Sequence, residues 1–272
     1  MAALISTYAV ADRPLKAHPG VGETISQTLT MARRALIKMM RNPEQFFDVT
    51  IQPLLFTAMF AYIFGGAISG DVKAYLPTII TGILAQTALT ASMARGTQLR
   101  EDMDKGVFDR FKALPIARIA PLAGPAVADL LRYGIAATLT IVVGLLMGYR
   151  PGGGVGGVLA GWALTIFAGW SLSWIFTWLG TVLKTAGGVQ GLGMMIMFPL
   201  TFLSPAFVPK ETMPNWLQHF VDVNPVTLVI NATRDLMNAG DLTLSVVWAL
   251  AGCAAVVAIF APISVWSYSK KL

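Results

Sequence analysis

Long stretches without any charged side chain dominate the sequence. Six such runs occur, and they are Val49–Gly70, Ala74–Ala94, Tyr133–Tyr149, Pro151–Leu183, Thr185–Pro209 and Leu242–Ser269. A helix needs about 20 mostly apolar residues to cross a bilayer, and five of the runs reach that length. The run that begins at Tyr133 is shorter, but Ile119–Ala128 extends it upstream, interrupted only by Asp129 and Arg132. The pattern therefore predicts six membrane-spanning helices, at residues 49–70, 74–95, 122–149, 156–183, 186–208 and 243–267.

The composition supports a membrane protein with a single domain. Hydrophobic residues make up 55% of the 272-residue chain and charged residues only 12%, whereas an average soluble domain carries roughly 25% charged residues. Transmembrane strands are about 10 residues long and alternate in polarity, unlike these runs. We therefore expect an all-α polytopic membrane protein. Its single transmembrane domain covers residues 23–272 and follows a flexible tail at residues 1–22, where prolines and glycines are frequent.

Lys and Arg residues lie mostly on one side of the six predicted helices. Fifteen of the 20 fall before the first span, in the second and fourth connections, or after the last span. The four on the opposite side are Lys73, Arg150, Lys210 and Arg234. Because basic residues are retained on the cytoplasmic side, we expect a multi-pass protein of the cell membrane with both termini in the cytoplasm. The net charge of +6 is then a topology signal and does not indicate nucleic-acid binding.

Residues 23–41 have the periodicity of an amphipathic helix. Apolar positions share one face, and Arg34, Lys38 and Arg41 lie opposite. Asn42-Pro43 ends the helix, because the residue before a proline resists the helical conformation. A basic amphipathic helix beside a span is typical of the cytoplasmic membrane interface. We interpret it as an elbow helix that lies on membrane lipid before the first span. The alternative is a lipid-bound helix without a functional role.

The segment from Arg95 to Arg118 is dense in charge and also amphipathic. Acidic and basic residues separate apolar residues at helical spacing, which are Leu99, Met103, Val107, Phe108, Phe111 and Leu114. A helix that only binds the anionic cytoplasmic leaflet needs mostly basic residues, so the mixed charge favours contact with a protein surface. We expect a cytoplasmic helix that docks on a protein partner, and the alternative is a solvated loop.

Residues 209–241 connect the last two predicted spans on the outer side. Trp216 lies in a short apolar stripe that Asn224-Pro225 breaks, and a second stripe that includes Arg234 follows. Two short amphipathic pieces are typical of a re-entrant or interfacial cap, whose backbone has to be shielded by protein or water. The alternative is an ordinary surface loop in which Trp216 is an interfacial anchor.

No grouping of catalytic or metal-binding residues can be drawn from the sequence. His18 and His219 lie far apart, and Cys253 is the single cysteine. The phosphate-binding pattern G-x-x-x-x-G-K-[ST] does not occur, so any use of ATP requires another chain to bind it. Asp129 and Arg132 are the ionisable residues nearest to mid-membrane. They are three residues apart and can pair on one helix face, as an interfacial ion pair or as part of a gate.

Three motifs, in order along the chain, carry a resemblance to a known family. They are Arg41-Asn42-Pro43 at the end of the amphipathic helix, Glu101-x-x-x-x-Gly106-x-x-x-Arg110-x-x-x-Leu114-Pro115 followed by Arg118, and Pro214-x-Trp216-Leu217 followed by Asn224-Pro225 and Arg234. In this order they resemble the type-2 ABC-transporter permeases and, within them, the daunorubicin-resistance-like drug exporters.

The resemblance implies a six-span permease that dimerises, with a second copy or a sister permease, and docks on two separate ABC ATPase subunits. These partners would use ATP and Mg, while this chain would be no enzyme and would bind no cofactor. It implies export of a hydrophobic or amphipathic compound, which can be drug-like, a lipid or a polyketide, from the cytoplasm or the inner leaflet. It also implies which residues couple the chain to the ATPase, and these are Glu101, Asp104, Lys105, Gly106, Phe108, Asp109, Arg110 and Lys112.

Two other functions are alternatives to this one. A secondary transporter driven by protons would rely on Asp129, because ionisable residues within a membrane usually mark such pathways. A membrane scaffold that transports nothing would need none of the residues singled out above.

Overall fold

The computed structural model describes residues 20–107, 116–117 and 119–270. All regular structure in these residues is helical. The long helices are α1 (Val21–Arg41), α2 (Pro43–Ser69), α3 (Val72–Asp104), α5 (Ala120–Leu146), α6 (Gly154–Val182), α7 (Ala186–Phe202) and α10 (Leu244–Ser269). Between α7 and α10 lie the short elements η1 (Lys210–Thr212), α8 (Asn215–Val223), α9 (Pro225–Arg234) and η2 (Asp235–Ala239).

Five helices in the described part of the chain are long and apolar enough to cross a membrane. They are Thr50–Ser69 within α2, and the whole of α3, α5, α6 and α10. The predicted span at residues 186–208 is helical only as far as Phe202, and residues 203–208 form turns and a bend. Its helix, α7, has 17 residues and is about 26 Å long at 1.5 Å per residue. Five of the six predicted spans are thus supported, and the span at α7 stays a prediction.

Helix α3 extends well beyond the predicted span at residues 74–95. It has 33 residues and is about 50 Å long, whereas the hydrocarbon core of a bilayer is about 30 Å thick. The charged segment that was expected to leave the bundle from Arg95 on is still part of α3 as far as Asp104, and the side chain of Arg95 is only 4% exposed. Leu99 of the predicted docking stripe packs on Leu122 of α5 and Tyr268 of α10, so this part of the stripe belongs to the transmembrane domain.

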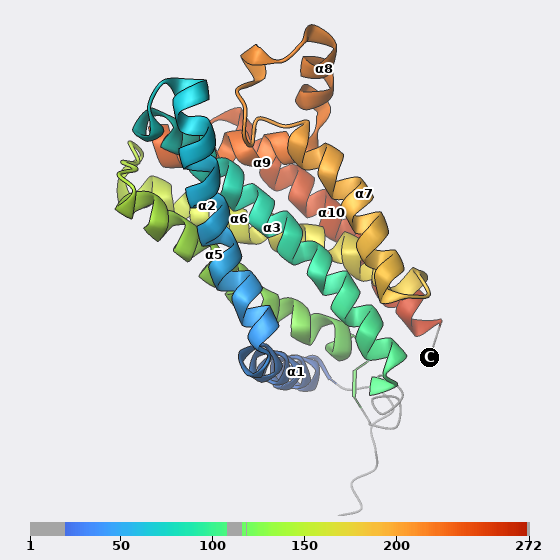
Figure 1. Ribbon diagram of the computed structural model, residues 1–272. Helices are drawn as coiled ribbons and strands as arrows, with labels where there is room; N and C mark the ends of the chain where they lie inside the picture. The colour runs from blue at the N-terminus through green and yellow to red at the C-terminus, as the bar shows by residue number, and fades with distance from the viewer. Residues whose placement is uncertain (1–19, 108–115, 118, 271–272) are drawn as a thin grey trace, which may run out of the picture.

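Helix α3 lies at the centre of the bundle, against α2, α5, α6 and α7 (Figure 1). Its first half contributes the largest fully buried side chains, among them Tyr75, Leu76, Ile79, Ile80, Ile83 and Leu84. Its second half approaches α6 through glycines. A Cβ atom added to Gly96 would lie 2.2 Å from the carbonyl oxygen of Phe176, and one added to Gly180 would lie 2.5 Å from the carbonyl oxygen of Gly96. Small residues allow such close backbone packing within membranes.

The two ends of the bundle carry different elements (Figure 1). Helix α1 lies across the foot of the bundle, at the same end as the C-terminus of α10, and α8 lies at the opposite end. α1 packs against α5, where a Cβ atom on Gly124 would come within 2.3 Å of the Cβ atom of Met31. Gln27 Oε1 also accepts a hydrogen bond of 2.8 Å from the backbone N–H of Ala117. The predicted helix is confirmed as a helix, and it ends at Arg41 as expected.

Candidate functional site

The first half of the predicted coupling segment lies at the end of α3 that is closest to α1. Glu101, Asp104 and Lys105 are exposed there. Arg100 forms an ion pair with Asp104, and Lys105 Nζ lies 3.7 Å from Glu101 Oε2. Ion pairs near a protein surface contribute little to stability. The helix ends at Asp104, and Gly106, two residues further on, has a positive φ of 65°.

The second half of this segment, with Phe108, Asp109, Arg110 and Lys112, lies outside the described residues. The coupling helix itself therefore remains a prediction. The described residues fix where its chain begins, because α3 continues without a break from the buried core to Asp104.

Helix α1 is attached to the same end of α3 through its basic face. Lys38 Nζ donates a hydrogen bond of 2.7 Å to Asp102 Oδ1, while Arg34 and Arg41 are exposed. Along its apolar face, Ile25, Leu29 and Met40 each expose more than half of their surface, and Ala32 and Met39 are buried. An apolar face of which only part packs on the bundle leaves side chains that can enter lipid. The described contacts therefore fit the predicted elbow helix without testing its role.

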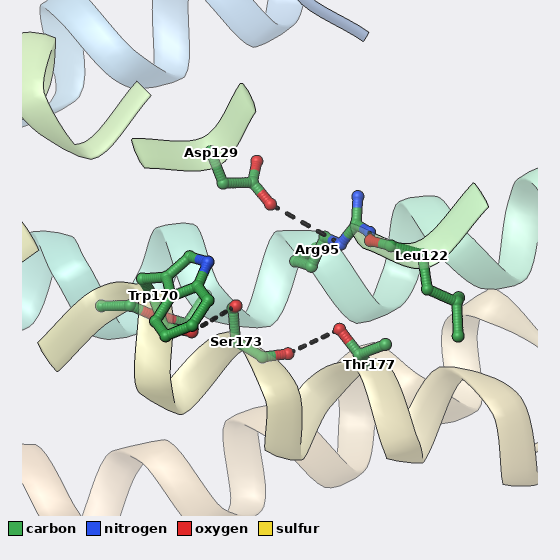
Figure 2. A network of polar contacts seen from close by, with 8 residues as sticks. Arg95, Leu122, Asp129, Trp170, Ser173 and Thr177 are labelled. Atoms are coloured by element: carbon green, nitrogen blue, oxygen red, sulfur yellow. Dashed lines mark hydrogen bonds and ion pairs between the residues drawn. The ribbon is translucent and has the colours of Figure 1, made fainter. Parts of the chain in front are cut away.

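A buried ion pair joins α3 to α5. Arg95 Nε lies 3.6 Å from Asp129 Oδ2, and an Nη atom of Arg95 donates a hydrogen bond of 2.8 Å to the carbonyl oxygen of Leu122. Figure 2 shows the two charged side chains facing each other across the helices. The sequence suggested that Asp129 can pair with Arg132 on its own helix; the structure adds a second basic partner, Arg95, from the neighbouring helix.

Arg132 is also buried, at 4% exposure. It lines a cleft between α1, α3 and α5 that holds about 780 Å³ of space, part of which is open to solvent. We call this the cationic cleft, and its charged lining residues are Arg34, Lys38, Arg95, Asp102, Asp129 and Arg132. Two predicted groups, the basic face of α1 and the Asp129–Arg132 pair, are thus brought together in one place that the sequence did not indicate.

At the opposite end of the bundle, the predicted cap residue Asn224 joins two helices through hydrogen bonds. Asn224 is buried, and its Nδ2 atom donates hydrogen bonds of 2.8 Å to the carbonyl oxygens of Leu200 and Leu203, which satisfies the end of α7. Its Oδ1 atom accepts a hydrogen bond from the N–H of Val226, so it also caps α9, in which Pro225 is the first residue. Asn224 therefore connects the last turn of α7 to the first turn of α9.

Arg234 and Trp216 have opposite environments. Arg234 ends α9 and donates a hydrogen bond of 2.8 Å to the carbonyl oxygen of Pro205. Burial lowers the pKa of its guanidinium from the usual value, and the neighbouring Asp235 partly offsets this. Trp216 is 74% exposed on α8, as expected for an interfacial anchor. The predicted break at Asn224-Pro225 is confirmed, whereas a re-entrant depth stays a prediction.

An apolar cavity between α3, α6, α9 and α10 had no signal in the sequence. It holds about 560 Å³ of space, part of which is open to the surroundings, and its lining includes Leu89, Ala168, Leu172, Val229, Trp248 and Cys253. Its residues come from four separate segments whose apolar character is the same as that of lipid-facing positions, so periodicity alone could not separate the two. A cavity of this kind can accommodate an apolar group.

These features define a polytopic membrane protein with a helical bundle, a basic helix across one end and a capped helical loop at the other. The sequence profile of the ABC-2 type transporter family matches residues 26–238. The chain belongs to this family, and it is a membrane-spanning permease subunit of an ABC transporter.

Two of the following relatives carry names from drug resistance, and the third is named only as a transport permease. The chain is 38% identical over 268 residues to the daunorubicin resistance ABC transporter permease protein DrrB1 of Streptomyces coeruleorubidus, which covers 98% of this chain and 93% of that protein. It is 23% identical over 221 residues to a probable doxorubicin resistance ABC transporter permease protein DrrC of Mycobacterium tuberculosis, covering 80% and 79%. It is 27% identical over 228 residues to a putative transport permease ycf38 of Cyanophora paradoxa, covering 78% and 74%.

Proposed function

We propose that this chain is the membrane half of an ATP-driven exporter for a hydrophobic or amphipathic, drug-like compound. The observation that carries the proposal is the similarity over 98% of the chain to a permease named for daunorubicin resistance. The apolar cavity between α3, α6, α9 and α10 supports it, since its lining suits the rings or chains of such a compound.

In this proposal six helices cross the cell membrane, and the sixth is formed by α7 together with the turns that follow it. Asn224 supports this, because its hydrogen bonds to Leu200 and Leu203 satisfy the backbone where α7 ends short of a full span. An even number of spans places both termini on one side, and the distribution of basic residues puts that side in the cytoplasm. Two such permeases, identical or sister chains, form the transport pathway.

The energy enters through two ABC ATPase subunits that bind ATP and Mg. Their docking surface is the exposed end of α3, with Glu101, Asp104 and Lys105, together with the segment up to Lys112. The mixed charge and weak surface ion pairs of these residues support this assignment. Helix α1 lies at the same end of the bundle and is joined to α3 through Lys38 and Asp102, so a movement of the docked ATPase would reach both helices.

The test is to purify the chain together with its ABC ATPase partner and to reverse charges at the docking surface. We expect Glu101→Lys and Arg110→Glu to reduce both copurification and ATP-driven export of daunorubicin from inverted vesicles. Asp222→Lys is the matched control, because Asp222 is an exposed acid in α8, at the opposite end of the bundle. A complex and an export rate that are unchanged in both docking variants would contradict the proposal.

The two alternative functions give different results in the same vesicles. A proton-driven transporter would export its compound without ATP and would lose activity in Asp129→Asn. Asp129 lies beside Arg95 in the core, which accounts for it without a transported proton. A scaffold would show no stimulation of the ATPase by any compound.

A further inference from the structure

The apolar cavity between α3, α6, α9 and α10 opens on one side of the bundle. Most of its lining residues are buried, but Pro225, Trp248 and Gly252 are exposed. Pro225 is the first residue of α9, and the other two belong to α10. A Cβ atom added to Gly252 would meet no atom within 4 Å. The opening of the cavity therefore lies between the start of α9 and the first half of α10.

The surface around this opening is apolar. Helix α10 is long and apolar enough to cross a membrane, and it packs mainly against α6 and α9. Next to the opening, Val247, Trp248 and Leu250 expose 60%, 63% and 43% of their surface. Exposed apolar side chains on a membrane-spanning helix are suited to contact with lipid chains, which are as apolar as they are. The cavity thus opens on a surface that fits lipid hydrocarbon.

The opening lies closer to the α8 end of the bundle than to the α1 end. Gly252 lies about 12 Å along α10 from Leu244, the first residue of this helix, at about 1.5 Å per residue. The last residues of α10 lie at the α1 end, and α9 lies at the α8 end (Figure 1). The leaflet beside the opening is therefore the one opposite α1, which is the outer leaflet in the topology proposed above.

The lining suits an apolar ring system. Polar groups are few: the hydroxyl of Ser171 donates a hydrogen bond of 2.7 Å to the carbonyl oxygen of Phe167, and the buried thiol of Cys253 is a weak donor. A charged group would lose its hydration in such a place without gaining a partner. At the opening, the indole of Trp248 can stack on a planar ring. The cavity therefore fits the apolar part of a compound and leaves the polar part outside.

We propose that this cavity holds the apolar rings of the exported compound and exchanges them with the adjoining leaflet through the opening between α9 and α10. The identity of the compound rests on the function proposed above, and the cavity adds its route. The compound passes sideways into lipid in the leaflet opposite α1 and does not cross this half of the membrane in a water-filled channel.

The first test measures binding of daunorubicin to the full-length chain in nanodiscs of dioleoyl phosphatidylcholine, by fluorescence anisotropy against empty nanodiscs. We expect Gly252→Phe to weaken binding at least about tenfold, because the new ring occupies the opening. Ala254→Phe is its matched control, since Ala254 is exposed on the same helix and does not line the cavity. Trp248→Ala should weaken binding about two- to tenfold through the lost aromatic contact. Trp266→Ala, at a position of α10 that is 60% exposed, should not.

The second test locates the bound compound. We expect a nitroxide on the acyl chains of the lipid to quench the fluorescence of bound daunorubicin more strongly than iodide in the water does. Stronger quenching by iodide would place the compound in a water-filled path and overturn the proposal. Cross-linking of the cavity by a lipid with a diazirine on its acyl chain, at a level that daunorubicin does not reduce, would assign the cavity to lipid alone.

Equal affinity in wild type, Gly252→Phe and Trp248→Ala would overturn the proposal, and so would equal losses in Gly252→Phe and Ala254→Phe. If Gly252→Phe elutes as aggregate in size-exclusion chromatography, the comparison of Trp248→Ala with Trp266→Ala decides. The two proposals can fail separately. ATP-driven export at the wild-type rate in Gly252→Phe would contradict the sideways route and leave the exporter in place. Binding that Gly252→Phe abolishes, in a chain without ATP-driven export, would do the reverse.

Discussion

The guanidinium of Arg95 and the carboxylate of Asp129 meet inside the helical bundle, 3.6 Å apart. The two residues belong to different helices, and both are buried, with Arg95 4% exposed and Asp129 7% exposed. The sequence suggested that Arg95 begins a charged segment outside the bundle and that Asp129 can pair with Arg132 of its own helix. Their contact therefore fixes the relative position of α3 and α5 in a way that hydropathy could not indicate.

Removal of one partner of this pair should destabilise the protein strongly. We expect Asp129→Asn to cost about 3–5 kcal/mol, because it leaves the charge of Arg95 buried without compensation. The midpoint of thermal unfolding in detergent measures the loss. Asp222→Asn is the control: its pair with Lys210 is exposed and contributes only about 0–1 kcal/mol. Equal losses in the two variants would show that the buried pair has no special weight.

The contact between α3 and α6 should not tolerate a methyl group at Gly96. The added Cβ atom would lie 2.2 Å from the carbonyl oxygen of Phe176, so Gly96→Ala should cost about 1–3 kcal/mol through overpacking. Gly191→Ala in α7 adds the same atom where nothing lies within 4 Å, and it should stabilise its helix by up to about 1 kcal/mol. Unfolding midpoints that move in the same direction for both variants would contradict the packing argument.

Asn224 should be sensitive to the loss of its amide donor alone. Asn224→Asp keeps an acceptor for Val226 but removes both hydrogen bonds to α7, at a cost of about 1–3 kcal/mol for each unsatisfied carbonyl. We expect a lower unfolding midpoint and faster proteolysis between α7 and α9. In Asn215→Asp, at an exposed position that begins α8, the same chemical change should have little effect; an equal effect there would refute the capping role.

Displacement of α1 from the bundle should make its buried face accessible to chemical labelling. Ala32 is 5% exposed, so a cysteine at this position in a Cys253→Ala background should react slowly with a maleimide. Gly124→Val should increase the rate, because the new side chain collides with Met31. Gly66→Val, in open space on α2, is the control. An unchanged labelling rate in Gly124→Val would mean that this contact does not hold α1.

Much of the fold could be predicted, because a bilayer requires long apolar helices and their lengths can be read from charge-free runs. The end of α1 at Arg41 and the break at Asn224-Pro225 follow from local backbone preferences that act within a few residues. The length of α3 could not be predicted in this way. Charged residues near its C-terminus resemble a loop when they are counted singly, yet Arg95 finds its partner and its hydrogen-bond acceptor on another helix.

The candidate site was harder to predict than the fold. The positions of Arg34, Lys38 and Arg132 are each plain in the sequence, but their convergence depends on how α1 crosses α3 and α5. That crossing depends on Gly124, which has no side chain to collide with Met31. The sequence alone does not distinguish Gly124 from the other glycines of the chain, which number 26 in all. The apolar cavity was missed for a related reason, since its lining has the same composition as surfaces that face lipid.

The unbroken length of α3 has a mechanical consequence. Near one end, the hydroxyl of Tyr75 donates a hydrogen bond to the carbonyl oxygen of Phe207, and Gly82 lies directly against the backbone of Ala206. Near the other end, Asp102 holds α1. A stiff rod about 50 Å long that crosses a layer of about 30 Å acts as a lever when it tilts. A pull on the arm near Asp102 would swing the arm near Tyr75 the opposite way, and the segment with Ala206 and Phe207 would have to follow.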